Sequence, residues 1–161
     1  RNHLESLSER SCVPFEKELQ HVRYYLAIQQ RRFGDRIHVV YEIEETDFIM
    51  PPLTLQPIVE NAGKHGICKK EEGGTITICT KLEDHFVSVI VKDDGIGFDR
   101  EKIKQDGKSH IGLKNVSERV KSMCNGSFYV KSEPGQGTIV QLLFPQKSKK
   151  NYVDNKIISN S

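Results

Sequence analysis

Four polar side chains of different chemistry lie close together in residues 55–66. Read as a helix, this stretch places its apolar residues on one face at spacings of three and four, and its reactive polar residues on the other. The polar residues are Glu60, Asn61, Lys64 and His65. An amide oxygen suits Mg²⁺, which keeps waters and substrate phosphates as its remaining ligands. The stretch therefore predicts either a magnesium–phosphate site or an ordinary amphipathic helix.

A second candidate site is the loop Asp93-Asp94-Gly95-Ile96-Gly97, which directly follows a strand predicted over residues 86–92. An ionised Asp93 only accepts hydrogen bonds, so it would accept the amino hydrogen of adenine and repel the carbonyl of guanine. Gly95 and Gly97 would let the backbone approach a ligand without a Cβ in the way. Asp-Gly pairs also form turns. Taken alone, the loop indicates an adenine site or a simple turn.

Two more glycine motifs follow. Ile111-Gly112-Leu113 leads into a predicted helix, and backbone N–H groups at a helix N-terminus attract phosphate. Residues 99–110 before it contain lysines and a glycine, which is compatible with a lid over a nucleotide or with a surface loop. Thr138 follows the turn Gly135-Gln136-Gly137 and could support the Asp93 loop from behind. No GxxxxGK[ST] sequence is present, so P-loop phosphate binding is excluded.

The first element expected to position these residues is a helix over residues 15–33, which Gly34 ends. Its seam residues recur at alternating spacings of four and three, as in helices that pack along another helix. Two interpretations stay open: a dimer seam, or a helix docked on its own domain. The seam residues are Phe15, Leu19, Val22, Leu26, Gln29 and Phe33.

Strands alternate with helices in the rest of the chain. The strands are predicted over residues 37–43, 75–81, 86–92, 128–132 and 138–144, and the helices over residues 55–66 and 112–124. Thr54 is the expected N-cap of the first of these helices. This order predicts a two-layer α/β sandwich with a mixed, largely antiparallel sheet, preceded by the N-terminal helix.

Composition narrows the class of protein. The 161 residues amount to about one domain, and the net charge of +2 without a basic stripe argues against nucleic acid as a partner. Apolar runs fall far short of the roughly 20 residues that cross a bilayer. The four cysteines form no CxxC pair and have no zinc-site spacing, so free thiols in a reducing cytosol are expected. They are Cys12, Cys68, Cys79 and Cys124.

In their order, the four motifs resemble the N, G1, G2 and G3 boxes of the GHKL ATPase superfamily. The similarity is closest to the ATP-binding domain of LytS/YesM-type sensor histidine kinases. It covers residues 15–145 and includes the connecting text of residues 18–35 and 52–62. The resemblance implies the Bergerat α/β sandwich fold, ATP and Mg²⁺ as cofactors, and transfer of the γ-phosphoryl group to a histidine.

The resemblance also implies roles for individual residues. Asn61 would hold Mg²⁺, Lys64 and His65 would lie near the phosphates, and Asp93 would bind adenine. Glu60 could orient a metal-bound water or the incoming imidazole, the alternative being a helix-surface carboxylate. Residues 99–110 would form the lid. The other pocket residues implied by the resemblance are Gly95, Gly97, Gly112, Leu113 and the supporting Thr138.

The chain departs from the family pattern at several positions. His110 occupies the first glycine position of the second box, and Gly63 stands where a branched apolar residue is usual. The chain contains no Pro-His-Phe-type acceptor motif, so the acceptor histidine is expected outside this fragment. ATP-hydrolysing members carry a water-activating Glu four residues before the Asn, where this chain has Pro57. A kinase domain is therefore expected, with a degenerate nucleotide-binding interaction module without kinase activity as the alternative.

We expect three regions: a helical second part of the dimerisation region (residues 1–35), the catalytic domain (residues 36–146) and a polar, disordered tail (residues 147–161). The expected partners are ATP, a cognate response regulator and a second copy in the full protein. A membrane is expected only through segments outside this fragment, which would make this a cytoplasmic domain of an inner- or plasma-membrane sensor.

Overall fold

The computed structural model describes residues 11–99, 101 and 111–146. The predicted tail and almost all of the predicted lid lie outside these residues. The elements are β1 (Val13–Pro14), α2 (Phe15–Phe33), η1 (Gly34–Arg36), β2 (Ile37–Ile43), β3 (Ile49–Met50), α3 (Leu55–Asn61), η2 (Ala62–Gly66), η3 (Ile67–Lys69), β4 (Gly74–Glu83), β5 (Phe86–Asp93), α5 (Ile111–Cys124), β6 (Ser127–Glu133) and β7 (Gly137–Pro145).

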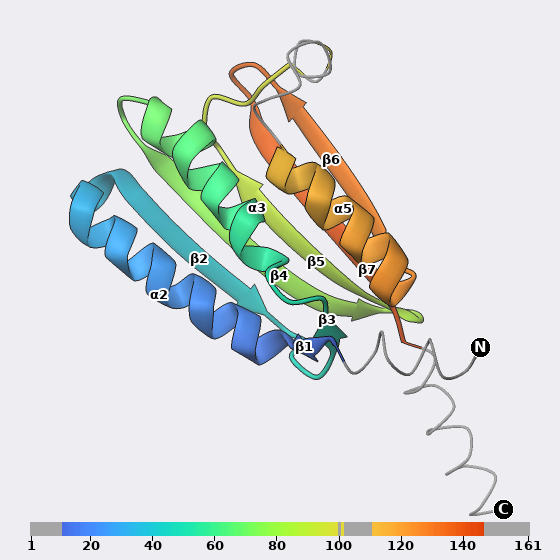
Figure 1. Cartoon of the computed structure of the whole chain (residues 1–161). Helices are drawn as coiled ribbons and strands as arrows, with labels where there is room; N and C mark the ends of the chain where they lie inside the picture. The colour runs from blue at the N-terminus through green and yellow to red at the C-terminus, as the bar shows by residue number, and fades with distance from the viewer. Residues whose placement is uncertain (1–10, 100, 102–110, 147–161) are drawn as a thin grey trace, which may run out of the picture.

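The main sheet has five strands in the order β2-β4-β5-β7-β6. β2 and β4 run parallel, and every other neighbouring pair is antiparallel. The helices α2, α3 and α5 lie side by side on one face of this sheet (Figure 1). The predicted two-layer α/β sandwich with a largely antiparallel sheet is confirmed.

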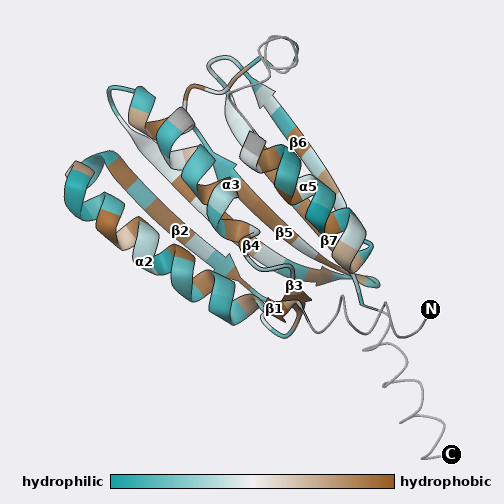
Figure 2. Cartoon of the chain, in the orientation of Figure 1, coloured by the Kyte–Doolittle hydropathy of each residue, from teal (hydrophilic) through white to brown (hydrophobic). Residues whose placement is uncertain are grey.

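Alternation along the strands separates the buried face of the sheet from its open face. Val87, Val89 and Val91 of β5 are buried, and they pair with the buried residues Phe144, Leu142 and Val140 of β7. Figure 2 shows the apolar stretches of β4 and β5 behind the more hydrophilic outer surfaces of the helices. Burying each such side chain stabilises the fold by about 1.5–3 kcal/mol. None of the helices in the described part of the chain is long and apolar enough to span a membrane.

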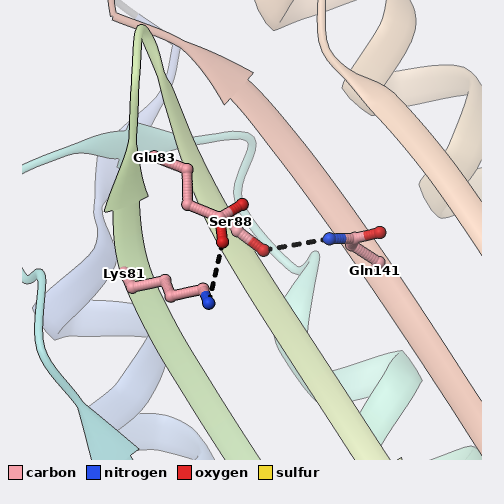
Figure 3. A network of polar contacts seen from close by, with 4 residues as sticks. All are labelled: Lys81, Glu83, Ser88 and Gln141. Carbon is pink, nitrogen blue, oxygen red and sulfur yellow. Dashed lines mark hydrogen bonds and ion pairs between the residues drawn. The ribbon is translucent and has the colours of Figure 1, made fainter.

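The open face of the sheet carries polar contacts instead (Figure 3). Lys81 and Glu83, two residues apart on β4, form an ion pair of 2.8 Å. Gln141 of β7 donates a hydrogen bond of 3.1 Å from Nε2 to Ser88 Oγ of β5. Because successive residues of a strand point to opposite faces, these side chains lie away from the helices.

The predicted N-terminal helix is observed with its expected bounds as α2, and Gly34 ends it with φ +63°. Its seam residues Phe15 and Leu26 are buried in the core of the same chain. The Phe15 ring stacks on Phe48 at 4.7 Å between centroids. Of the two interpretations of the seam, docking on its own domain is the arrangement observed in this chain.

Residues 55–66 are helical as predicted, but they do not form one regular α-helix. The apolar face is buried as predicted, but the α-helix ends at Asn61 and widens into the π-helical turn η2. Glycine has a low helix propensity, and both Gly63 and Gly66 lie in η2. The prediction of a helix through residue 66 therefore holds, but its last turn is π-helical rather than α-helical.

Thr54 occupies the expected N-cap position, immediately before α3, but the predicted capping hydrogen bond from its side chain is not observed. Its hydroxyl instead donates to the carbonyl oxygen of Pro51 at 2.6 Å. Another residue, far away in the sequence, supplies the cap.

Candidate functional site

The start of α3 is held by a carboxylate from α2. Glu18 is only 4% exposed, and its Oε1 accepts the backbone N–H groups of Thr54 at 2.8 Å and Leu55 at 3.2 Å. Its Oε2 accepts the N–H of Leu53 at 3.3 Å. Arg119 of α5 donates to the Leu53 carbonyl oxygen from the other side. A negative charge at a helix N-terminus satisfies unpaired N–H groups and complements the helix dipole, so Glu18 caps α3.

The other end of α3 carries the predicted polar residues. Asn61 is the last residue of α3 and is half-buried, whereas Lys64 is exposed in η2. His65 also belongs to η2, and its side chain lies outside the described atoms. This end of α3 therefore presents an amide and a cation on neighbouring turns.

Glu60 lies on the side of α3 that faces α2. Its Oε1 accepts a hydrogen bond of 3.0 Å from Gln56 Nε2, one turn earlier. Burial raises the pKa of Tyr25 on α2, and the negative charge of Glu60 raises it further. Gln56 of the same helix therefore holds the Glu60 carboxylate, which lies close to the phenol of Tyr25.

Asp93 lies at the end of β5 on the face covered by the helices, and is 4% exposed. Its Oδ1 accepts the N–H of Gly95 at 2.9 Å. Burial raises the pKa of Asp93 to about 6, and backbone hydrogen bonds from Gly95 and Thr138 offset only part of that rise. Among the described residues, no recorded ion pair compensates its charge. A buried acceptor of this kind is suited to a ligand that brings hydrogen-bond donors.

The π-helical turn η2 lies directly over the Asp93 loop. A Cβ on Gly66 would be 2.8 Å from Asp93 Oδ1, and a Cβ on Gly95 would be 2.3 Å from the carbonyl carbon of Gly66. The N–H of Ile96 also donates to the Gly66 carbonyl oxygen at 3.3 Å. The two backbones can approach this closely only because both positions are glycine.

The second glycine of the loop rests on the β6–β7 turn. Gly97 has φ +67°, and a Cβ there would be 2.1 Å from the carbonyl oxygen of Glu133. The N–H of Gly135 donates to the Ile96 carbonyl oxygen at 2.6 Å. The turn and the loop therefore fit each other through backbone contacts.

Hydroxyl groups join the same loop to β6 and β7. Phe98 N–H donates to Ser132 Oγ at 2.9 Å. Ser132 Oγ lies 2.8 Å from Thr138 Oγ1 and donates to the Gly137 carbonyl oxygen at 3.1 Å. Thr138 thus lies behind the loop and holds it through Ser132.

The first turn of α5 lies beside α3. A Cβ on Gly112 would be 3.8 Å from Pro57 Cβ, which is ordinary van der Waals contact. Leu113, the next residue, is buried in the core. His110 and almost all of the predicted lid lie outside the described residues.

These contacts bring together η2, the Asp93 loop, the β6–β7 turn and Thr138, and they place the start of α5 against Pro57 of α3. Glu60 lies instead on the side of α3 that faces α2. Three supporting residues were missed in the sequence: Glu18, Gly66 and Ser132. Glu18 reads as a surface position on an amphipathic helix, and nothing in the sequence indicates that Gly66 approaches Asp93. In the described part of the chain, no three His, Cys, Asp or Glu side chains could together hold a metal ion.

A family model described as "Histidine kinase-, DNA gyrase B-, and HSP90-like ATPase" matches residues 51–148. Among curated proteins, the chain is 38% identical over 135 residues to the putative uncharacterized protein YwpD of Bacillus subtilis, covering 80% of this chain and 49% of that protein. It is 36% identical to the sensor histidine kinase YpdA of Escherichia coli and 32% identical to the sensor protein LytS of Oceanobacillus iheyensis. These alignments cover 80% and 89% of this chain. The chain spans about half of YwpD and about a quarter of the two sensor proteins.

Solved structures agree on the fold. The histidine kinase domain of the blue-light activated histidine kinase EL346 from Erythrobacter litoralis superposes with a TM-score of 0.65 at 21% identity, covering 86% of this chain and 64% of that one. The catalytic domain of the histidine kinase ThkA gives a TM-score of 0.63 at 15% identity, covering 84% and 95%. The predicted resemblance to a histidine kinase ATP-binding domain is confirmed. This chain belongs to the histidine kinase-, DNA gyrase B- and HSP90-like ATPase family.

Proposed function

We propose that this domain binds ATP together with Mg²⁺ and transfers the γ-phosphoryl group to a histidine outside this chain. The observation that carries the proposal is the buried, unneutralised Asp93 carboxylate beneath the glycine contact of Gly66 and Gly95. Its neighbouring donors are backbone N–H groups, which leaves the carboxylate suited to an amino group of a planar ring. Adenine carries such a group, whereas guanine would present a carbonyl oxygen.

The phosphate end of the proposed site involves α3, η2 and α5. Asn61 would offer its amide oxygen to the cation, Lys64 would neutralise phosphate charge, and His65 is proposed near the same phosphates. The N–H groups at the start of α5, next to Gly112 and Leu113, are suited to bind phosphate oxygens. Bound Mg·ATP would supply the phosphoryl group and its charge compensation.

The proposed reaction does not require a base that activates water. Pro57 occupies the place of that base four residues before Asn61, and phosphoryl transfer depends mainly on positioning and charge stabilisation. Glu60 is proposed to orient the incoming imidazole, which would then approach from the side of α3 that faces α2, where Gln56 donates to the carboxylate. A Glu60→Gln variant would then lose transfer rate while keeping nucleotide affinity.

The surroundings of the domain are also proposals. The sensor proteins among its relatives support a larger protein in which residues 1–35 belong to the dimerisation region and residues 36–146 form the catalytic domain. We propose a homodimer, a cognate response regulator as the final acceptor, and membrane attachment through segments outside this chain.

The first test is calorimetric titration with ATP and with GTP, each with and without Mg²⁺. We expect binding of ATP over GTP, strengthened by Mg²⁺ and weakened about 10- to 100-fold by Asp93→Asn, the range for losing a charge-assisted hydrogen bond. Asp94→Asn is the matched control. The adjacent Asp94 is exposed, and its Oδ1 accepts the N–H of Thr75 at 2.7 Å, on the β4 side. Equal weakening by both substitutions would reject Asp93 as the adenine ligand.

A degenerate interaction module is the second candidate, and the specific observation that favours it is His110 at the first glycine position of the second box. If the module has lost function there, His110→Gly should raise ATP affinity strongly. If His110 is a tolerated variant, affinity should stay unchanged, and radiolabel from γ-labelled ATP should appear on a supplied acceptor-histidine fragment.

A further inference from the structure

Outside the candidate nucleotide site, two thiols that are far apart in the sequence lie in contact. Cys12 Sγ and Cys124 Sγ are 3.5 Å apart, although 112 positions separate them in the sequence. Both side chains are half-buried. From this contact we propose that Cys12 and Cys124 form an oxidisable thiol pair, which peroxide converts into an intramolecular disulfide and which thiols reduce again. The proposal does not depend on the nucleotide function.

The fold itself holds the two cysteines together. Cys12 precedes β1, where Val13 pairs with Met50 of β3, and Phe15 N–H donates to the Phe48 carbonyl oxygen at 2.9 Å. Cys124 is the last residue of α5, and the following turn is closed by Gly126 N–H donating to the Val120 carbonyl oxygen at 3.0 Å. Both backbones are therefore positioned by ordered hydrogen bonds, and the contact does not depend on a chance encounter of loose ends.

The bond needs only a local movement. A disulfide is about 2.05 Å long, so the two sulfur atoms must approach each other by roughly 1.5 Å. Rotation about the Cα–Cβ bonds moves each sulfur, and Cys12 and Cys124 lie just outside the regular part of β1 and at the end of α5.

The chemistry balances with a peroxide as the oxidant. One thiolate attacks a peroxide oxygen, the O–O bond breaks, and hydroxide leaves and takes a proton to become water. The second thiol then attacks the resulting sulfenic sulfur, the S–O bond breaks, and a second water leaves as the S–S bond forms. The two sulfur atoms together lose two electrons, and the two peroxide oxygens gain them.

The chain contains its own control thiols. Cys79 donates from Sγ to Glu42 Oε2 at 3.2 Å, and burial together with Glu42 raises the pKa of Cys79 to about 11. Little of it is thiolate at neutral pH, so it should react slowly. Cys68 is also half-buried. In the described part of the chain, the thiol–thiol contact is the one between Cys12 and Cys124, so Cys68 has no second thiol in contact with which to form a disulfide. We therefore expect oxidation to be selective for this pair.

The consequence is mechanical. The bond would link the N-terminal end of the described chain to the C-terminal end of α5, across a loop of 112 residues. Cross-links that close long loops restrict the unfolded chain most, so oxidation should raise the thermal midpoint by roughly 10 °C. α5 begins at Ile111, about 20 Å away along the helix, beside the candidate nucleotide site.

The experiment uses the whole chain, fully reduced and then exposed to stoichiometric hydrogen peroxide at neutral pH. Remaining thiols are alkylated in denaturant, and unreduced peptides are analysed by mass spectrometry. We expect a cross-linked peptide joining Cys12 and Cys124, lighter by two hydrogens, while Cys68 and Cys79 remain alkylatable. Cys79→Ser should keep the cross-link, whereas Cys124→Ser should lose both the cross-link and the rise in thermal midpoint.

Three results would overturn the proposal. One is alkylation of Cys12 and Cys124 to the same extent as Cys68 and Cys79 after peroxide treatment. Another is oxidation of either residue to a sulfinic acid without a cross-link, and the third is a disulfide between two chains. Circular dichroism of each serine variant confirms that it folds, so that loss of the cross-link is not caused by unfolding.

Discussion

The two ends of α3 differ in how a buried carboxylate contacts them. At the N-terminal end, the carboxylate of Glu18 accepts backbone hydrogen bonds, whereas the C-terminal end widens into a glycine-containing π-helical turn above Asp93. The first carboxylate accepts protein N–H groups at both oxygens and serves the fold. The second lies buried where only part of its charge is compensated. Burial of a carboxylate therefore does not by itself identify a ligand site. The deciding property is whether hydrogen-bond donors of the protein already satisfy the carboxylate oxygens.

The largest expected effect comes from removing the Glu18 carboxylate that caps the N-terminal end of α3. Glu18→Ala would leave three backbone N–H groups, two of them buried, without this acceptor, and we expect a loss of about 3 kcal/mol in the free energy of unfolding. Urea denaturation measures this loss. Glu16→Ala on the exposed face of the same helix turn is the matched control, with an expected loss below about 1 kcal/mol. Similar losses for both variants would contradict the capping role of Glu18.

The second prediction concerns how the free energy of unfolding depends on pH through Asp93. Because the pKa of Asp93 is raised from 3.8 to about 6, the folded chain keeps a proton that the unfolded chain has already lost between these values. Stability due to this group is therefore full below about pH 4, falls as pH rises towards 6, and is level above that, a total change of about 3 kcal/mol.

Asp93→Asn removes this titration. The variant should be more stable than the wild type at pH 7 while binding ATP more weakly. Differential scanning fluorimetry of both proteins from pH 3.5 to 8 tests this, and the difference between the two curves cancels other titrating groups. A difference that does not change with pH would show that burial imposes no such cost on Asp93.

A smaller loss of stability is expected from a substitution that forces η2 and the Asp93 loop apart. Gly95→Ala places a Cβ 2.3 Å from the Gly66 carbonyl carbon, so one backbone must shift, at a cost of about 1–3 kcal/mol. We also expect it to abolish nucleotide binding. Gly63→Ala is the control in η2, because its Cβ would lie 3.8 Å from the Tyr25 hydroxyl and alanine favours a helical turn by up to about 1 kcal/mol. Equal loss from both variants would mean that η2, rather than the Gly66–Gly95 contact, limits the site.

The smallest expected effect is on the support behind the loop. Ser132→Ala removes the hydroxyl that accepts from the Phe98 N–H and that contacts Thr138 Oγ1, for a loss of about 1 kcal/mol. ATP affinity should fall several-fold because the loop is less firmly held. Ser122→Ala, an exposed hydroxyl on α5, should change neither stability nor affinity. An unchanged affinity in Ser132→Ala would separate this support from the nucleotide site.

Much of the candidate site could be predicted because its residue types and their spacing form motifs within short stretches of sequence. The Asp-Gly motif after β5 and the Gly-Leu at the start of α5 mark a strand end and a helix start, which are features of short stretches of sequence. Periodicity likewise predicted α2 with its bounds and the buried face of α3. The helix over residues 55–66 was predicted, but its change to a π-helical turn after Asn61, where it lies against the Asp93 loop, was not.

Local patterns in the sequence were enough to predict the strand and helix order, the two-layer architecture and the family, since alternation, helical spacing and motif order are properties of neighbouring residues. The cap of α3 by Glu18, the contact of Gly66 with Asp93 and the contact of Cys12 with Cys124 are visible only in the folded chain. No local pattern encodes them, because the partners are far apart along the chain. These contacts join residues 27 to 112 positions apart, and packing alone selects such partners.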